Sequence, residues 1–552
     1  MDSSKRVKLS PDMEAGDEAL QQAVKAINDG EHFFDVTIIC TTDDYQAAYW
    51  MDLLSQSSKS MVLAVSEDWS SSGGAGNGLG TLYAWQKACA LAKSKFGTDL
   101  AAGLRDGSLS TSLYHTAGKG TRMAPLPASE SNNKPGVKLP FPLKLPDGSV
   151  RPITVLECVL RQTGIYARKG RLSVFWGDQV FLPTAPFHVE PTHHADILCT
   201  LLGDTAPTAE EWKAQGLDKY GVIAVLGQED GKVEAAQVEK VSQETAVKML
   251  SGIPGSLKQV GPSLGSFSVS AAILEALEAE FAPELSAKTG KLDTDPHFWM
   301  PLTLPLDSYI QLMDQKGTSA EESTQHYERM SKMKAAFLEK TASDGLGLFG
   351  AVDVGKGACW WDYGQLKLYS KNASLLLAPD SDPSASLLRQ FLGLGEDKAL
   401  GSICASGSEV DDKSYIIASK LGATSKIASS LVAGVVCPNL ECDGAIVVNC
   451  TAKSIKAGNG AILYNLMSEG EIVVEAGHVE VGLAEIKDGN VNFDSVLKSR
   501  LDIDGGDAWK VKLDMNNLSF EDVHTKNKNA DITIIASKRK EMADKIALSL
   551  GL

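Results

Sequence analysis

The chain has 552 residues, 43% of them hydrophobic, which is enough to bury the cores of two or three domains. Aspartate and glutamate number 70 against 53 lysines and arginines, and the net charge of −17 argues against nucleic acid or an anionic membrane as the main partner. No apolar run reaches the roughly 20 residues of a membrane-spanning helix, and the polar N-terminus is unlike a secretory signal. The nine cysteines are irregularly spaced, which predicts reduced thiols and a cytoplasmic protein.

Strand and helix patterns alternate through the first part of the chain. Residues 1–30 are predicted to form a polar N-terminal tail with one short helix at 15–28. A basic stretch in this tail, Lys5-Arg6-Val7-Lys8-Leu9, could be a nuclear import signal, but a solvated, disordered segment is favoured because short basic motifs are weak signals. Beyond the tail the alternation predicts an α/β domain with a largely parallel sheet. Short apolar runs predict strands at 33–40, 61–65, 110–114 and 171–178, and helical patterns lie at 43–57, 82–91 and 153–164.

A glycine-rich run at 70–82 is the first of two loops that look suited to a ligand. It contains Gly73, Gly74, Gly76, Gly78 and Gly80, and it follows a strand and opens a helix. Such a run is either a flexible surface loop or a loop that admits a flat ring or a phosphate against bare backbone. Its position after a strand favours the ligand site, because ligands bind beyond strand C-termini in sheets of this type.

The second loop, residues 115–125, has the composition of a polyphosphate site. It offers Gly118 and Gly120, whose backbone N–H groups can approach phosphate oxygens closely, together with Thr121 and Arg122. Lys134 follows a short distance later and adds a point charge. No Gly-Lys-Ser/Thr closes the loop, so it is not a Walker A motif.

Several acidic and histidine residues follow predicted strands. Asp178 comes directly after one buried strand, where a carboxylate is well placed to hold Mg²⁺ on a bound phosphate, and Asp362 ends another strand at 358–364. A hairpin is expected at 220–240. Other polar residues have open roles: Asp293 and Asp295 could contact a sugar or cap a helix, and the cluster of His188, His193, His194 and Glu190 is expected to be structural or at a substrate edge rather than a metal site.

The periodicity changes at about residue 403. Apolar residues then recur six positions apart, which is the hexapeptide pattern of a β-helix. We expect this β-helix over 400–485, and a C-terminal cap over 486–552 with strands at 509–513 and 532–535 and a final helix at 538–548. The six-residue steps are 410–416, 421–427–433, 440–446, 455–461 and 466–472.

The stretch from Gly118 to Pro125, with Lys134-Pro135, resembles the signature of sugar-1-phosphate nucleotidyltransferases, also called nucleotide-sugar pyrophosphorylases. Three further stretches follow in family order over roughly residues 33–485. They are Trp176-Gly177-Asp178 and Trp361-Asp362-x-Gly364, which look like the two metal-binding strand ends, and Val238-Glu239-Lys240, which looks like the sugar-binding pair. The resemblance implies a Rossmann-like, GT-A-like mixed sheet in a catalytic domain over 31–380, and a left-handed form for the parallel β-helix.

The order of the loops is unusual for this family. The glycine-rich loop that would hold the nucleotide base comes before the phosphate signature, as do two strands. We infer a permuted sheet, in an order similar to that of fucose-1-phosphate guanylyltransferases. UTP and GTP are both candidate nucleotides.

The resemblance also implies partners and roles for individual residues. The substrates would be a nucleoside triphosphate and a sugar 1-phosphate with Mg²⁺ as cofactor, and homo-oligomers could form through the β-helix. A non-catalytic relative that binds a nucleotide-sugar is the alternative. The implied catalytic residues are Arg122, Lys134 and Lys240, the sugar-binding residues are Glu239 and Lys240, the metal-binding residues are Asp178 and Asp362, and the nucleotide-binding residues are Gly78, Leu79, Gly80, Thr81, Ala117, Gly118, Lys119, Gly120 and Thr121.

Overall fold

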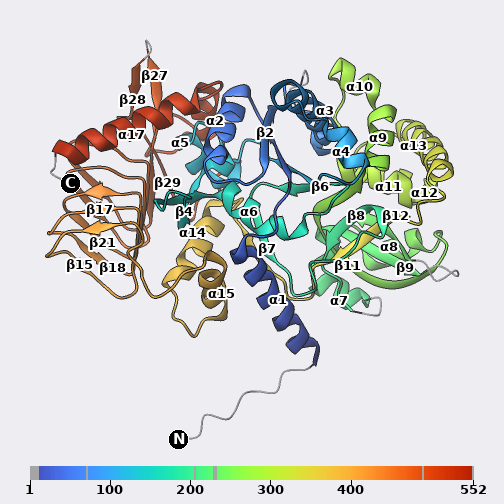
Figure 1. Cartoon of the computed structure of the whole chain (residues 1–552), viewed down its shortest axis with the longest axis horizontal. Coiled ribbons are helices and arrows are strands. Elements are labelled where there is room, and N and C mark those ends of the chain that lie inside the picture. The colour runs from blue at the N-terminus through green and yellow to red at the C-terminus, as the bar shows by residue number, and fades with distance from the viewer. Residues whose placement is uncertain (1–10, 70–72, 204–206, 228–232, 488–489, 550–552) are drawn as a thin grey trace, which may run out of the picture.

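A large mixed sheet lies at the centre of the molecule, and a strand-rich region lies at one end (Figure 1). The computed structural model describes residues 11–69, 73–203, 207–227, 233–487 and 490–549. Three features expected from the sequence lie outside these residues: the basic stretch near Lys5, the serines at 70–72 and the hairpin turn at 229–231. The expected alternation of strands and helices is confirmed, and the chain has a mixed α/β fold.

Among the described residues, the central sheet has nine strands. Four of them are parallel and lie in the order β2-β1-β3-β6, so the chain moves outward from β1 to β2 and then returns to β3 on the other side of β1. Strand β11 joins β6 by antiparallel pairing, so parallel pairing is less extensive than the sequence predicts. The nine strands are β1 (Val36–Thr41), β2 (Met61–Ser66), β3 (Thr111–His115), β6 (Arg171–Trp176), β8 (His193–Cys199), β9 (Gly221–Gly227), β10 (Val233–Glu239), β11 (Ser256–Ser270) and β12 (Gly347–Asp353).

Both faces of the parallel strands are buried, which explains their continuous apolar runs. Neighbouring residues point to opposite faces, so Ile38 and Leu63 lie in one core cluster while Ile39 and Ala64 lie in another. The first face is covered by α3 (Gly76–Phe96), α4 (Leu100–Arg105), α9 (Ala271–Glu280) and α13 (Ala320–Lys340), and the second by α2 (Asp44–Ser55), α6 (Val155–Thr163) and α14 (Leu366–Ser374). The hairpin β9–β10 packs on a third cluster with α7 (Ala209–Ala214), α8 (Gln243–Leu250), α11 (Met300–Thr303) and α12 (Leu306–Gln315).

The sequence predicts a polar tail over residues 1–30, but residues 11–29 form a helix that packs on the domain. Helix α1 (Pro11–Asp29) is longer than expected, and Ala23, Val24 and Ile27 on one of its faces are buried in the core. Its end is also held by hydrogen bonds, because Asn28 Nδ2 donates to Gln390 O of α15 (Pro383–Leu392) at 2.8 Å. Residues 11–29 therefore belong to the folded domain.

The segment between the 115–125 loop and β6 also differs from expectation. The sequence predicts one helix there, but an antiparallel hairpin precedes it, formed by β4 (Lys138–Lys144) and β5 (Val150–Thr154). Helix α6 then starts at a capping box in which Thr154 and Glu157 satisfy each other's backbone N–H groups. The two prolines in β4 hide the strand from propensity arguments, although an edge strand tolerates them.

The strand-rich region at 403–482, which we call the coil, is built from three parallel sheets. Each strand pairs with the strand one turn later: Leu421 pairs with Cys437, and Ile427 with Cys442. Most of the apolar residues at the recurring positions form their own core cluster, whereas Ala433 and Ile446 pack into the cluster shared with the sheet domain and Val410 is exposed. One sheet contains β14 (Ile403–Cys404), β17 (Lys420–Leu421) and β20 (Val436–Cys437); the second contains β15 (Glu409–Val410), β18 (Lys426–Ala428), β21 (Leu440–Asp443), β23 (Ser454–Ala457) and β25 (Glu471–Val474); the third contains β16 (Tyr415–Ile417), β19 (Leu431–Ala433), β22 (Ile446–Val448), β24 (Ile462–Tyr464) and β26 (His478–Gly482).

The last part of the chain, residues 485–549, covers the coil and is called the cap here. The strands predicted at 509–513 and 532–535 are wrong: the first stretch is irregular, and the second begins α17 (Ile532–Ser549), which runs along the coil (Figure 1). Asp531 accepts a hydrogen bond from Ile534 N and caps this helix, so a short apolar run that suits either structure becomes helical. The cap also contains β27 (Glu485–Lys487), β28 (Asn490–Asn492), β29 (Val496–Arg500) and α16 (Phe520–Lys526). Within the described ranges, no helix combines the length and the apolar character that crossing a bilayer requires.

Candidate functional site

A cleft of about 580 Å³ runs along the carboxyl ends of the parallel strands. The ends of four strands supply part of its wall: Asp43 after β1, Glu67 after β2, His115 at the end of β3 and Trp176 at the end of β6. The strand order reverses between β1 and β3, and ligands of open α/β sheets bind at such a reversal. The position of the cleft therefore follows from the topology of the sheet.

The 117–121 loop forms one side of the cleft through Ala117, Gly118 and Lys119. Gly118 has φ of 146° and Gly120 has φ of 63°, values that suit glycine and turn the loop sharply after β3. From Ala117 to Gly120, no backbone N–H group donates a hydrogen bond to another described residue. A loop with open N–H groups and a lysine is a suitable anion site.

The 73–77 loop forms the opposite side through Gly73, Gly74, Gly76 and Asn77. Glu67 holds this loop, because one of its carboxylate oxygens accepts the N–H group of Ala75 at 2.9 Å. Burial raises the pKa of Glu67.

The four glycine-run residues expected to bind nucleotide lie further inside. Gly78, Leu79, Gly80 and Thr81 are buried in the first turns of α3, and the N–H groups of Gly78 and Leu79 donate to Leu292 O at 2.8 and 3.2 Å. Gly78 has no room for a side chain, because a Cβ there would lie 2.9 Å from that same oxygen. A ligand in the cleft would therefore meet the residues just before them.

His115 lies between the two loops. Burial lowers its pKa to about 4, so the ring is neutral near pH 7. Its Nε2 atom lies 2.8 Å from Thr81 Oγ1, and its ring packs against Trp176 with 5.4 Å between centroids. These contacts fix the floor of the cleft.

The structure brings together three of the charged residues selected from the sequence. Lys134 forms an ion pair with Asp178, and Asp362 lies in the same small space. Gly364 keeps that space open: a Cβ there would lie 2.9 Å from Asp362 Oδ1 and 3.0 Å from Asp178 Oδ2. Burial raises the pKa of Asp362, and the nearby negative charge of Asp178 acts in the same direction, while the positive charges of Lys134 and Arg122 oppose it. The space is therefore lined by acidic oxygens that a further cation would stabilise.

This cluster is joined to the cleft through two contacts. The side chain of Lys134 packs against Gly120, where a Cβ would lie 3.1 Å from its carbon atoms. Gly177 N donates to His115 O at 3.2 Å, which fixes Asp178 next to the end of β3. No described group of three or more His, Cys, Asp or Glu residues is arranged to hold a metal ion.

The predicted sugar-binding pair lies at the end of β10, and neither residue lines the cleft. Glu239 forms ion pairs with Lys316 at 2.5 Å and with Lys240 at 3.1 Å, and Lys240 is 63% exposed. Burial and the charge of Glu239 raise the pKa of Asp295 to about 6. Glu239 and Asp295 therefore interact electrostatically, and Asp293, two residues before Asp295, lines the cleft.

The sequence leaves two roles open for Asp293 and Asp295, and the structure narrows them. The turn at 295–299 has no side-chain cap. Asp293 instead caps α3, because its Oδ1 atom accepts the N–H group of Asn77, in the first turn of that helix, at 3.0 Å.

The histidines expected to be structural have structural contacts. His193 and His194 are buried in β8; His193 Nε2 lies 2.6 Å from Val233 O, and His194 Nδ1 lies 2.8 Å from Ser270 Oγ. His188 lies near the ring of His32, with 6.2 Å between centroids.

Residues of the cap complete the cleft, and sequence reasoning missed them. His524, Lys528 and Asn529 line its wall beside Lys119. Asn132 Nδ2 donates to His524 O at 2.7 Å and holds the two parts together. Two features of the sequence could have pointed to the cap: the basic residues that end α16 and the pair Gly505-Gly506. The two glycines allow a close approach to the 117–121 loop, because a Cβ on Gly505 would lie 2.4 Å from Thr121 O and Gly506 lies against the side chain of Arg122.

A comparison of the chain with models of known protein families gives no match, and a search of curated proteins gives none either.

Proposed function

We propose that the protein is a sugar-1-phosphate nucleotidyltransferase, which forms an NDP-sugar and pyrophosphate from a sugar 1-phosphate and a nucleoside triphosphate. One observation carries the proposal: the cleft at the strand reversal is directly connected to the cluster of Asp178, Asp362 and Lys134. The 117–121 loop, with its open N–H groups, forms one side of that cleft. A nucleotide-binding site needs a loop that binds the phosphates and charged groups that neutralise them. The 117–121 loop and the cluster of Asp178, Asp362 and Lys134 lie next to each other and could supply both. The sequence resemblance selects the same residues.

The fold supports the proposal in its finer details. In the order β2-β1-β3-β6, strand β3, which carries the 117–121 loop at its end, lies between β1 and β6. This order is the one expected for a permuted Rossmann-like, GT-A-like sheet. The coil has the parallel pairing, one turn to the next, of a β-helix. We propose that this β-helix is left-handed, as in many relatives of this class.

The triphosphate would lie against the 117–121 loop. The open N–H groups of the loop would bind its β- and γ-phosphates, and Arg122 would bind the leaving pyrophosphate. Lys119 and Lys528 add positive charge to the same wall of the cleft. The nucleoside would extend toward the 73–77 loop, and both UTP and GTP remain candidates.

The pair of carboxylates fits Mg²⁺. Asp178 and Asp362 offer oxygen ligands around a space that Gly364 leaves open, and Mg²⁺ commonly takes one or two carboxylates together with phosphate oxygens and water. When bound, the ion would neutralise charge on the α-phosphate. Lys134 already contributes one positive charge at this point through its ion pair with Asp178.

The sugar phosphate would enter from the β10 side. Lys240 is exposed and would exchange its ion pair with Glu239 for one with a phosphate, and Glu239 and Asp295 would accept hydrogen bonds from sugar hydroxyls. An oxygen of the sugar phosphate then attacks the α-phosphorus, the bond from that phosphorus to the bridging oxygen of the β-phosphate breaks, and pyrophosphate leaves with the bonding electrons. Two anions react, so the protein acts by positioning them and by neutralising charge.

A pyrophosphate-release assay tests the proposal. The full chain is mixed with Mg²⁺, each of the four nucleoside triphosphates and a panel of sugar 1-phosphates. Release that requires both substrates supports the enzyme and identifies the base and the sugar. Binding of a nucleotide-sugar without release from any pair would indicate the alternative, a non-catalytic relative.

A further inference from the structure

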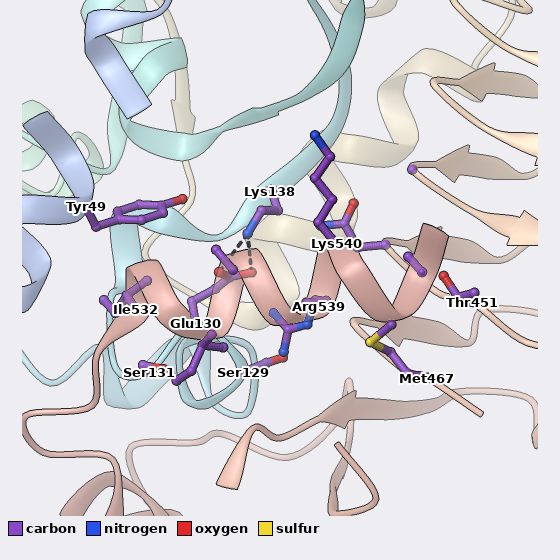
Figure 2. A pocket seen from close by; sticks show the side chains of 15 residues that line it. Tyr49, Ser129, Glu130, Ser131, Lys138, Thr451, Met467, Ile532, Arg539 and Lys540 are labelled. Carbon is purple, nitrogen blue, oxygen red and sulfur yellow. Dashed lines mark hydrogen bonds and ion pairs between the residues drawn. The ribbon is translucent and has the colours of Figure 1, made fainter. Parts of the chain in front are cut away.

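A second cavity, of about 220 Å³, lies where three parts of the chain meet, away from the cleft (Figure 2). Tyr49 of α2 and the loop at 129–131 come from the sheet domain, Thr451 and Met467 from the coil, and Arg539 from α17. This volume is smaller than that of sites for drug-sized ligands, so it suits a small molecule or ion.

Arg539 lines this cavity and is only partly exposed, and Glu130, the acidic residue of the cavity wall, accepts no hydrogen bond from it. Its Nε and Nη2 atoms are buried, and neither finds a hydrogen-bond partner among the described residues. The guanidinium lies over the ring of Phe493, with 5.2 Å to the centroid, and this contact leaves its N–H groups unsatisfied. Burial lowers the pKa of Arg539. A buried charge with unsatisfied donors is costly, so its retention calls for a partner.

The nearest acidic group, Glu130, is already satisfied. Lys138 Nζ lies 2.7 Å from both of its carboxylate oxygens, while Tyr464 Oη donates at 2.5 Å and Asn465 Nδ2 at 2.8 Å. Figure 2 shows the ion pair of Glu130 and Lys138 beside Arg539. With Glu130 neutralised by Lys138, the cavity keeps the positive charge of Arg539.

We propose that this cavity is a binding site for a small phosphate-bearing anion, held by the Arg539 guanidinium. Arginine presents a planar fork of donors that matches phosphate oxygens, and Tyr49 and Thr451 add hydroxyl groups to the walls. The anion is either inorganic phosphate or the phosphoryl group of a small metabolite.

An anion at this site would strengthen the contact of the cap with the cleft. The loop at 129–131 leads directly to Lys134, and Asn527, just before α17, donates to Ala128 O at 2.7 Å. A ligand that holds Arg539 against this loop therefore also holds the cap segment that carries Lys528. The inference is independent of the reaction proposed for the cleft, because it rests on the buried charge alone.

Thermal unfolding of the full chain tests the site, with phosphate compared with chloride at equal ionic strength. Inorganic phosphate is expected to raise the midpoint temperature of unfolding of the native chain. It should bind the Arg539→Met variant at least about tenfold more weakly, because this variant lacks the hydrogen bonds from the charged guanidinium. Lys538→Met, which removes an exposed lysine on the same helix, should respond like the native chain. Arg539→Lys keeps the charge without the fork and should show an intermediate response, which covers the case in which the methionine variant fails to fold.

Two further arms complete the test. Glycerol 3-phosphate replaces inorganic phosphate in one, and tighter binding of either identifies the source of the phosphoryl group. Arg122→Met removes a cation proposed to bind phosphate in the cleft in the other, and the phosphate response that remains in this variant is expected to be lost when Arg539→Met is added to it. A response of the Arg122→Met variant that persists unchanged when Arg539→Met is added, or the absence of any response to either anion in the native chain, overturns the proposal.

Discussion

Replacing Gly364 with alanine puts a methyl group between the two carboxylates proposed to hold Mg²⁺. The added Cβ would lie 2.9 Å from Asp362 Oδ1 and 3.0 Å from Asp178 Oδ2, whereas ordinary contacts begin at 3.4 Å. Each oxygen must therefore retreat by roughly half an ångström, which is the tolerance within which metal and catalytic groups have to be held. The φ angle of Gly364 is outside the left-handed region, so the backbone accepts alanine.

We expect Gly364→Ala to reduce the rate of pyrophosphate release by about tenfold to 100-fold, because a misplacement of 1 Å costs about 100-fold. The rate is measured over a range of Mg²⁺ concentrations, and the concentration for half-maximal activity should rise. Gly395→Ala is the matched control, since its Cβ meets nothing within 4 Å and its φ angle also accepts alanine. Its activity should equal that of the native chain.

A readout that does not depend on the reaction accompanies the assay. Binding of Mn²⁺, followed by its electron paramagnetic resonance signal, should weaken in Gly364→Ala and stay unchanged in Gly395→Ala. Native activity and native Mn²⁺ binding in Gly364→Ala would refute the metal site between Asp178 and Asp362.

Three other predictions follow from the same residues. Asp178→Asn should lower kcat by about 100-fold to 1000-fold with the fold intact by circular dichroism, and an undiminished kcat would exclude its role in neutralising charge. Lys528→Ala should raise KM for the nucleotide by about twofold to fivefold, as expected for an exposed charge. Lys526→Ala, which changes a lysine outside the cleft, should leave KM unchanged. Equal effects of the two variants would show that the cap does not contribute to the nucleotide site. Asp295→Asn should be more stable to urea than the native chain, by a margin that grows as pH rises from about 4 to 6 and reaches on the order of 3 kcal/mol. The sign follows because the pKa of Asp295 is raised to about 6 in the folded state. As pH rises, the unfolded chain ionises this carboxyl before the folded chain does, which lowers the free energy of unfolding of the native chain but not that of the asparagine variant. A margin that shrinks with pH would contradict the burial of this carboxyl.

The sequence predicts the parallel half of the sheet well, because its strands are buried on both faces and read as apolar runs. The runs that contain Ile38, Leu63 and Leu113 all become strands of this half. Local patterns report less on pairing partners, so the antiparallel addition of β11 to β6 was not evident from them. The β4–β5 hairpin escaped for a local reason, since prolines in β4 oppose a strand assignment.

The cap was the hardest part to predict. The run Ile532-Thr533-Ile534-Ile535 is rich in β-branched residues and reads as a strand, but it starts a helix whose apolar face packs on the sheet domain and the coil. Tertiary packing outweighs β propensity there. The contribution of Lys528 to the cleft depends on that packing and has no local pattern.

The candidate site shows the same division. Motif spacing selects Lys134, Asp178 and Asp362, and the structure brings them together although they lie far apart in the chain. Glycine content also selects Gly78 and Leu79, but it cannot tell a loop that faces a ligand from a helix start whose N–H groups are used by a neighbouring carbonyl. The raised pKa of Asp295 depends on burial, which spacing does not report.

The most direct measurement of the central claim is phosphorus NMR of the full chain with Mg²⁺, a sugar 1-phosphate and UTP or GTP. The proposed reaction predicts the paired signals of a diphosphate-linked sugar and an equal amount of pyrophosphate, and about 100-fold slower formation of both products with Asp178→Asn at the same protein concentration. Triphosphate signals that stay unchanged with every sugar 1-phosphate, or release of pyrophosphate together with a nucleoside monophosphate alone, would contradict it.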